Sequence, residues 1–192
     1  PAYRPDGTYL VIGGAGGLGE AWSRAVIEAH DAQVVWVGRR PLDADIQRKL
    51  DALAQYGPAP VYINADAGDP VALARACADI RARFGRIDGV VHSALVLEDR
   101  SLAAMEPEAF RAALHPKVDA SIALARALTG SLDNAPAGDA PDFVLFFSSL
   151  QSFTMAAGQS NYAAGSTFAD ALADALPAHL ACPVKVMNWG YW

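Results

Sequence analysis

Short apolar segments alternate with helix-length amphipathic segments along almost the whole chain, and this alternation restricts the possible folds more than any other feature. Six segments have the length of a β-strand and lack strict polar alternation: 8–12, 33–37, 60–64, 89–93, 143–147 and 184–189. Helical patterns lie between them at 17–30, 43–56, 70–84, 107–128 and 160–176. Such strand–helix–strand repeats predict an α/β fold, a Rossmann-like, doubly wound parallel sheet with helices on both faces.

Helix-end signals and one linker support this assignment of strands and helices. Asp69 followed by Pro70 predicts an N-cap and a first helical residue, and Gly85 is placed where a helix should stop. Segment 129–142 is rich in Gly, Pro, Asp and Asn, and we expect it to be a surface insertion within one domain. Residues 1–192 are therefore expected to form a single unit, and the absence of an initiator Met indicates a piece of a larger protein.

Composition argues against several classes of function. The chain of 192 residues is 53% hydrophobic and carries a net charge of −6 without a basic run, so we expect no nucleic-acid partner. Cys77 and Cys182 lie far apart and there are only four histidines, so neither a metal site nor a disulfide is expected. With no apolar stretch near the ~20 residues of a membrane helix and no signal peptide, we expect no membrane partner and a cytoplasmic location.

A glycine-rich turn directly follows the first predicted strand. It consists of Gly13, Gly14, Ala15, Gly16, Gly17, Leu18 and Gly19, and it can be read with the spacing G-x-G-x-x-G or G-x-x-x-G-x-G. Glycines at a strand-to-helix turn let the backbone approach a pyrophosphate closely, and the phosphates then lie at the positive end of the helix. A flexible turn without a ligand is the alternative, and the position between the first strand and the first helix of an alternating chain disfavours it.

Residues after the second and third predicted strands bear on which dinucleotide could bind. Arg39 and Arg40 stand where NAD-binding folds carry an acidic residue, and guanidinium groups there fit a 2′-phosphate, which favours NADPH. The alternative is that both are solvated loop charges. Asp66 could accept a hydrogen bond from an adenine amino group, or it could cap a turn.

Polar residues also close the fourth and fifth predicted strands. Ser93 and Ala94 end the fourth strand where a cofactor would pass, and His92 beside them is expected to be a packed or hydrogen-bonded residue rather than a catalytic base. Ser149 ends the fifth strand, and Tyr162 follows 13 residues later, early in the next helix. Such a pair alone is typical of a helix cap and a core aromatic residue. Together with the glycine turn it indicates a carbonyl site beside a nicotinamide.

At these residues the sequence resembles the short-chain dehydrogenase/reductase superfamily and, more narrowly, the ketoreductase domains of modular polyketide synthases. The resemblance rests on the glycine turn, on the spacing from Ser149 to Tyr162, and on the stretches 88–94, 115–119, 146–150, 158–164 and 186–190. It covers nearly the whole chain in the same order. It implies a sheet of the short-chain dehydrogenase/reductase type that here lacks the last strand and the lid.

The resemblance also implies a reaction and a set of catalytic residues. The substrate would be a β-ketoacyl thioester on an acyl carrier protein, the cofactor NADPH, and further synthase domains would adjoin the chain in cis. Tyr162 would donate the proton, Ser149 would orient the carbonyl, and Lys117 of the preceding long helix would favour the phenolate and hold the ribose. Ser166, four residues after Tyr162, stands where the family usually carries Asn, a departure that affects the proton relay.

Two further expectations concern stereochemistry and the alternatives to catalysis. Asp99 matches the second Asp of the Leu-Asp-Asp signature of ketoreductases that form the D-hydroxyl, Thr154 replaces the Trp of the opposite class, and Gln159 is a second candidate for stereocontrol. The alternatives are a non-catalytic scaffold domain of the same synthase and a free-standing reductase of small ketones. Retention of the glycine turn and the three catalytic candidates argues against the scaffold, and Lys117 in place of the usual Lys argues against the free-standing enzyme.

Overall fold

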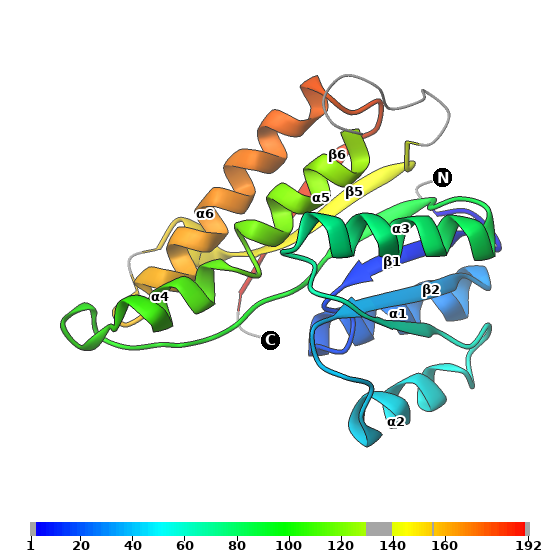
Figure 1. Ribbon diagram of the computed structural model, residues 1–192, viewed down its shortest axis with the longest axis horizontal. Coiled ribbons are helices and arrows are strands. Elements are labelled where there is room, and N and C mark those ends of the chain that lie inside the picture. The colour runs from blue at the N-terminus through cyan, green and yellow to red at the C-terminus, as the bar shows by residue number, and fades with distance from the viewer. Residues whose placement is uncertain (1–2, 130–139, 155, 191–192) are drawn as a thin grey trace.

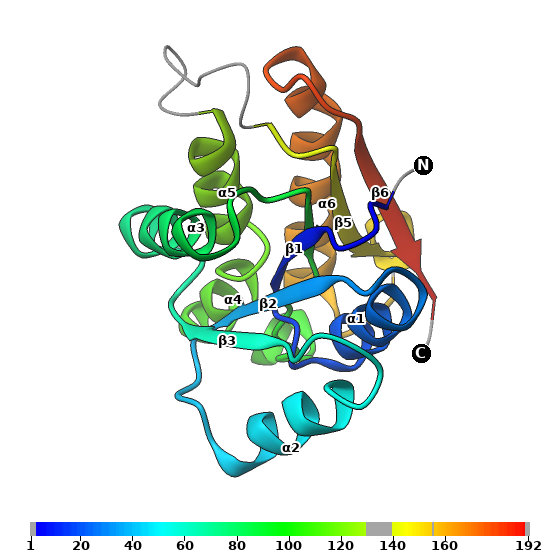
Figure 2. The same cartoon turned by 90° about the vertical axis from the view of Figure 1, so that its right-hand side faces the viewer.

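The computed structural model describes residues 3–129, 140–154 and 156–190, which form a six-stranded parallel sheet with helices on both faces (Figures 1 and 2). The strands are β1 Thr8–Ile12, β2 Gln33–Gly38, β3 Val61–Asn64, β4 Gly89–His92, β5 Phe143–Ser149 and β6 Val184–Trp189. Their order is β3-β2-β1-β4-β5-β6, and every pairing is parallel. The predicted doubly wound α/β sheet is therefore confirmed, with β6 at one edge.

Helices cover the two faces of this sheet in separate groups. They are α1 Gly17–His30, α2 Ala44–Leu53, α3 Pro70–Phe84, α4 Pro107–Leu114, α5 Asp119–Thr129 and α6 Ser160–Ala175. Figure 1 shows α1 and α2 on one side of the sheet and α3, α5 and α6 on the other. Because strands joined by right-handed crossovers all point the same way, their carboxyl ends meet at one rim, where ligands bind in such sheets.

The core consists of two buried layers that share β1. Leu10 and Ile12 pack toward α3, α5 and α6, whereas Tyr9 and Val11 pack toward α1 and α2. All four side chains are at most 1% exposed, which explains why the strand reads as a continuous apolar run. Burying each such side chain stabilises the fold by roughly 1.5–3 kcal/mol, so the rim of the sheet is a rigid support for the site.

One predicted helix is wrong: the segment 107–128 forms two helices. Residues 115–118 are a turn between α4 and α5, in which the N–H groups of Lys117 and Val118 both donate to the carbonyl of Leu114, at 2.9 and 2.6 Å. Pro116 explains the break, because proline has no N–H and its ring clashes with the preceding helical turn. Lys117 therefore lies in a turn rather than in a long helix, which corrects the placement that the resemblance implied.

The other helix boundaries agree more closely with the sequence. Asp69 caps α3 by accepting the N–H groups of Val71 and Ala72, as predicted, and Gly85 ends that helix with φ 88°. α2 is shorter than predicted, since it ends at Leu53. Most of the predicted insertion, residues 130–139, lies outside the described residues. That residues 1–192 form a single unit stays a prediction.

Neither a membrane-spanning helix nor a metal-binding cluster is present among the described residues. No helix in residues 3–129, 140–154 and 156–190 is long and apolar enough to cross a membrane. Across the same ranges, no group of three or more His, Cys, Asp or Glu side chains could hold a metal ion.

Candidate active site

The glycine turn between β1 and α1 leaves no room for side chains at three of its positions. Gly13 has φ +79°, and a Cβ there would lie 2.6 Å from Cα of Ala94. A Cβ on Gly14 would overlap the indole of Trp36, and one on Gly19 would lie 2.7 Å from Cα of Gly14. These glycines are therefore required by the close packing of the turn against β2 and the residues after β4. No side chain caps the start of α1 at Gly16, as expected if another group is to meet its first N–H groups.

The turn forms one wall of a cavity of about 480 Å³ at the carboxyl ends of the strands, the first cavity. This volume lies in the range typical of small-molecule sites. Two candidate cofactor residues, Gly14 and Gly19 of the turn, do not line this cavity. The candidates that do line it are Gly13, Ala15, Gly16, Gly17, Leu18, Arg39, Arg40, Asp66, Ser93 and Ala94. The structure thus brings the predicted cofactor residues together in one groove.

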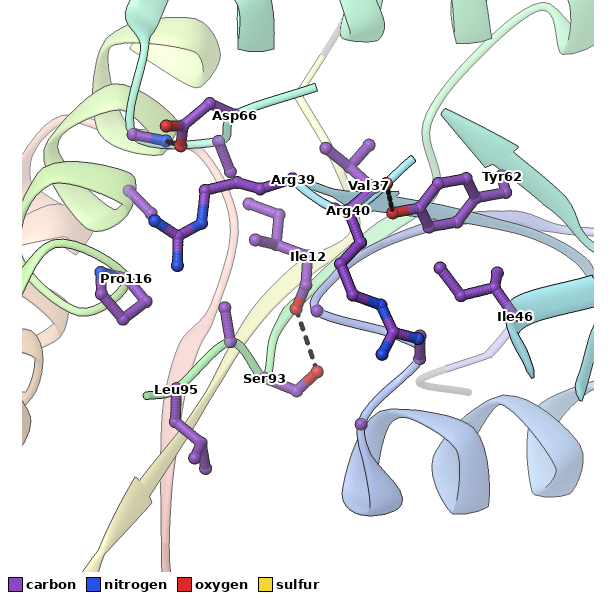
Figure 3. Close-up of a pocket in the computed structure, with 18 of the residues that line it drawn as sticks. Ile12, Val37, Arg39, Arg40, Ile46, Tyr62, Asp66, Ser93, Leu95 and Pro116 are labelled. Atoms are coloured by element: carbon purple, nitrogen blue, oxygen red, sulfur yellow. Dashed lines mark hydrogen bonds between the residues drawn. The ribbon is translucent and has the colours of Figure 1, made fainter. Parts of the chain in front are cut away.

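The two arginines after β2 enter the first cavity in different directions. Figure 3 shows Arg39 extending toward Pro116 and Arg40 extending toward the start of α1. Arg40 already pairs with Asp43, at 3.4 Å, and with Asp45, at 3.2 Å. An incoming phosphate would have to share Arg40 with these carboxylates, so Arg39 is the better candidate for a phosphate contact.

Two of the predicted cofactor residues also have local structural roles. Asp66 accepts the N–H of Gly68 at 2.9 Å, so it caps a turn as well as lining the cavity. Burial opposes the charge of Asp66, but the Gly68 N–H and the ring of His115 outweigh it and hold the pKa of the carboxyl below its ordinary value. The hydroxyl of Ser93 donates to the carbonyl of Ile12 at 2.9 Å, which joins β4 to β1 below the groove (Figure 3).

Sequence reasoning missed several further side chains that line the first cavity, and Lys49, Tyr62 and His115 are among them. Lys49 donates to the carbonyl of Ala15 at 2.7 Å and pairs with Glu20 at 2.9 Å, so it adds a positive charge beside the glycine turn. No local motif marks Lys49 or Tyr62, and His115 belongs to the stretch 115–119 of the resemblance without a role assigned to it there. Each side chain reaches the groove from an element whose place depends on the tertiary fold.

A second cavity of about 720 Å³ adjoins the first and contains two of the catalytic candidates. Ser149 and Tyr162 line it together with Gln159. The remaining lining is largely apolar and includes Leu95, Leu97, Leu150 and Trp189. The two cavities share Gly17, Leu18, Ser93 and Leu95, so a ligand that extends along the first would end beside Ser149 and Tyr162.

Lys117 lies behind the second cavity rather than in its wall. Its side chain is only 2% exposed, and Nζ donates to the carbonyl of Phe147 at 2.6 Å. It packs on α6 at Gly165, where a Cβ would come within 3.0 Å of the Lys117 Cβ. Burial lowers the pKa of Lys117 to about 8, although the carboxylate of Asp170 opposes this effect. The amine is therefore mainly charged at neutral pH, close to the helix that carries Tyr162.

The polar groups around Ser149 and Ser166 differ in how they are bonded. The hydroxyl of Ser149 accepts the N–H of Gln151 at 3.2 Å, which leaves its own proton available to a ligand. Asn188 donates to the Ser149 carbonyl at 3.2 Å and to Asp170 at 3.0 Å, so it supports the end of β5 from β6. Ser166 is fully buried, and its hydroxyl has no hydrogen-bond partner among the described residues.

A family model described as the KR domain matches residues 7–192. The chain belongs to this family. The polyketide synthases PksN and PksM of Bacillus subtilis are each 50% identical to it over 190 residues, or 99% of this chain. Polyketide synthase ThaG of Burkholderia thailandensis is 44% identical over 191 residues. The KR domain covers only 3–4% of the length of these relatives.

Solved structures agree with this assignment. A ketoreductase domain from the bacillaene assembly line has a TM-score of 0.89 at 31% identity, and the match covers 100% of this KR domain and 46% of that chain. An N-terminal ketoreductase from the macrolactin assembly line also has a TM-score of 0.89, at 26% identity, over 99% of this chain and 38% of that one. The predicted resemblance to polyketide synthase ketoreductases is therefore confirmed, as is the short-chain dehydrogenase/reductase type of sheet.

A nicotinamide dinucleotide, the cofactor of this family, fits the residues present in the KR domain. Gly13, Gly16 and Gly17 present no side chain to the groove that they line, and the turn opens on the uncapped start of α1. Arginine and lysine side chains flank the groove, as anionic phosphates require. The donor set therefore suits a dinucleotide.

The two stereocontrol candidates of the KR domain are hydrogen-bonded to each other. Gln159 Nε2 donates to Asp99 Oδ2 at 2.8 Å, and Gln159 alone of the two lines the second cavity. Asn161 donates to the carbonyl of Glu98 at 2.9 Å, so the loop that carries Asp99 is attached to the start of α6. Asp99 is therefore connected to the wall of the second cavity through Gln159.

His92 is packed, in agreement with the sequence analysis. Its ring stacks on Phe146 with centroids 5.5 Å apart, and neither ring nitrogen has a hydrogen-bond partner among the described residues. Burial lowers the pKa of His92 to about 3, and the nearby charge of Lys117 adds to this effect. The imidazole is therefore neutral at physiological pH.

Proposed function

We propose that this KR domain reduces the β-carbonyl of a β-ketoacyl thioester carried by an acyl carrier protein, with NADPH as cofactor, and forms the D-hydroxyl product. The main support for the proposal is that the two cavities are joined. Ser149 and Tyr162 line the second cavity, and the residues that it shares with the first include Gly17 of the glycine turn. A carbonyl placed between these two side chains would therefore lie at the end of the cofactor groove.

When bound, the reduced nicotinamide supplies hydride to the carbonyl carbon. The protein's own groups act on the oxygen. The Ser149 hydroxyl donates to the carbonyl oxygen, which can only accept, and orients it; the Ser149 proton is free for this because the contact with the Gln151 N–H uses only an oxygen lone pair. Tyr162 then transfers its phenolic proton to the developing alkoxide. The Lys117 ammonium, held by the Phe147 carbonyl, favours the phenolate that remains.

The preference for NADPH over NADH is supported by the guanidinium groups after β2. Arg39 and Arg40 both line the first cavity. Asp43 and Asp45 are paired with Arg40. Asp66, whose charge Arg39 also stabilises, is already bonded to the Gly68 N–H and the His115 ring. A 2′-phosphate near Arg39 would gain a charge-assisted hydrogen bond, whereas a free ribose hydroxyl would gain much less.

The D-hydroxyl outcome is supported by the contact between Gln159 and Asp99 on one side of the second cavity. This contact holds the Gln159 side chain against the cavity and limits how the acyl chain can enter.

The setting of the domain within a larger synthase is likewise a proposal. The relatives PksN and PksM are polyketide synthases of which this chain spans only 3–4%, so we expect a carrier protein and neighbouring synthase domains in cis. The cytoplasmic location stays a prediction.

The test compares the wild-type domain with Tyr162→Phe and with Tyr56→Phe as the matched control. Tyr56 contacts Arg24 away from both cavities, so its loss of a hydroxyl should leave turnover unchanged. Absorbance of the reduced nicotinamide is followed with a cyclic diketone and with a β-ketoacyl thioester. We expect Tyr162→Phe to lose roughly 100- to 10,000-fold in rate while its NADPH fluorescence titration is unchanged. Tight NADPH binding without turnover in any form would instead support the non-catalytic scaffold.

A further inference from the structure

His115 lines the first cavity and lies between two carboxylates. Its Nε2 is 3.0 Å from both carboxylate oxygens of Asp66, and its Nδ1 is 2.7 Å from Oδ2 of Asp119. Asp66 follows β3 and Asp119 begins α5, so the ring connects two elements that are remote in sequence. The turn that contains His115 also carries Lys117, two residues later.

The loop beside Asp66 is shaped to receive this ring. A Cβ on Gly68 would lie 2.6 Å from Nε2 of His115, so any side chain at that position would displace the imidazole. The Gly68 N–H also donates to Asp66, which fixes the carboxylate that faces the ring. The packing is therefore specific to a glycine and an imidazole in contact.

Both carboxylates can be satisfied only by the charged ring. A neutral imidazole has one N–H and one lone pair, so one of the two carboxylates would face a lone pair, whereas the imidazolium donates to both. Partial burial disfavours the charge, but the hydrogen bonds and charges of Asp66 and Asp119 outweigh it and raise the pKa of His115. Arg39 also acts on this cluster, because its positive charge helps to hold the pKa of Asp66 below its ordinary value.

We propose that His115 is a positioning residue: as an imidazolium it ties the adenine-side loop at Asp66 to the turn that carries Lys117, so cofactor affinity and the placement of Lys117 depend on one bridge. The proposal rests on the proposed function, because it takes the first cavity as the dinucleotide site. Loss of the proton at higher pH leaves one of the two carboxylates facing a lone pair, so the bridge is broken on one side, and it removes a positive charge from a groove that receives phosphates. Both effects weaken cofactor binding.

The first test measures the Kd of NADPH by fluorescence across pH 5.5 to 9, for the wild type and for His115→Gln. The exposed His179 gives the matched control, His179→Gln. We expect His115→Gln to bind roughly tenfold more weakly than the wild type at low pH and equally at high pH. The 2′-phosphate titrates in every variant, so its effect cancels in the ratio of Kd values. A ratio that stays near one, or that is constant across pH, would overturn the proposal.

Two further variants distinguish charge from shape. His115→Arg keeps a positive charge at every pH and should hold its affinity at the high end of the pH range, where the wild type loses affinity as His115 is deprotonated. Gly68→Ala should reproduce the weakness of His115→Gln at low pH, because its Cβ displaces the ring. If the Kd of NADPH for Gly68→Ala depended on pH as it does for the wild type, the bridge would be contradicted, even if His115→Gln did not fold.

A readout without cofactor separates this inference from the proposed function. In an NMR titration of the free domain, the histidine signal that disappears in His115→Gln should have its midpoint above about 6.5, and Asp66→Asn should lower that midpoint. An unchanged midpoint in Asp66→Asn would overturn the bridge. Failure of the wild type to bind NADPH at any pH would instead contradict the proposed function while leaving the NMR result to decide the bridge.

Discussion

Replacement of Lys117 by methionine tests the buried amine directly, because methionine keeps the length of the side chain but removes its charge. The Lys117 ammonium is 2% exposed and bonded to a single carbonyl, that of Phe147. Burial of a charge with so few partners costs stability, and this cost appears as the pKa of Lys117 lowered to about 8. The variant should therefore differ from the wild type in how its stability depends on pH.

The size of the effect on the unfolding free energy follows from how far the pKa of Lys117 is lowered. A change in pKa from 10.5 to about 8 corresponds to roughly 3.4 kcal/mol, at about 1.36 kcal/mol per unit. Because the folded-state pKa is the lower one, the cost is complete below pH 8 and disappears as pH rises toward 10.5. From pH 7 to pH 9.5 the wild type should gain roughly 2 kcal/mol of unfolding free energy relative to Lys117→Met. The lost hydrogen bond to Phe147 adds an offset that does not vary with pH.

Urea unfolding of both proteins at several pH values between 7 and 9.5 provides the assay, with m-values compared to confirm a common unfolded state. Lys185→Met is the matched control, since Lys185 is exposed on β6, and it should show a constant difference from the wild type. A difference between wild type and Lys117→Met that is constant within about 0.5 kcal/mol over this range would refute the buried-charge reasoning.

Four further predictions concern the site. Arg39→Ala should raise the Kd of NADPH roughly tenfold and leave that of NADH unchanged, as measured by calorimetry; an equal loss for both would exclude a 2′-phosphate contact. Asp170→Asn removes a charge that raises the pKa of Lys117, so the alkaline limb of the rate profile should move to lower pH, and an unmoved limb would count against this coupling. Ser166→Ala should change the unfolding free energy by less than about 1 kcal/mol, because the hydroxyl lacks a partner among the described residues; a larger loss in urea unfolding would reveal one. Gln159→Ala should lower the stereochemical purity of the alcohol, and chiral chromatography showing unchanged purity would remove it from stereocontrol.

Most of the fold could be predicted because a parallel sheet covered on both faces produces apolar runs that stand out from amphipathic helices. All six strands were found in this way. The helix predicted over 107–128 was wrong because its apolar periodicity continues through Pro116, although the proline itself was a visible reason to divide it. The early end of α2 at Leu53 had no comparable signal.

The site could be predicted only where it belongs to strand ends and turns. The glycine turn, Ser149 and Tyr162 follow from position along the chain, because carboxyl ends of parallel strands meet at one rim. The bridge at His115 and the support of Ser149 by Asn188 depend on side chains that meet across separate elements. Likewise, the sequence contains Arg40 and the carboxylates that pair with it, but only their distances show that this guanidinium is already engaged.

Label transfer tests the central claim most directly. The wild-type domain is incubated with a β-ketoacyl thioester and NADPH that carries deuterium in the transferable position at C4 of the nicotinamide, and the product is examined by mass spectrometry. The account predicts a β-hydroxyacyl thioester with deuterium on the β-carbon, formed by Tyr56→Phe and lost in Tyr162→Phe. An alcohol without deuterium, or labelled alcohol formed equally by Tyr162→Phe, would contradict it.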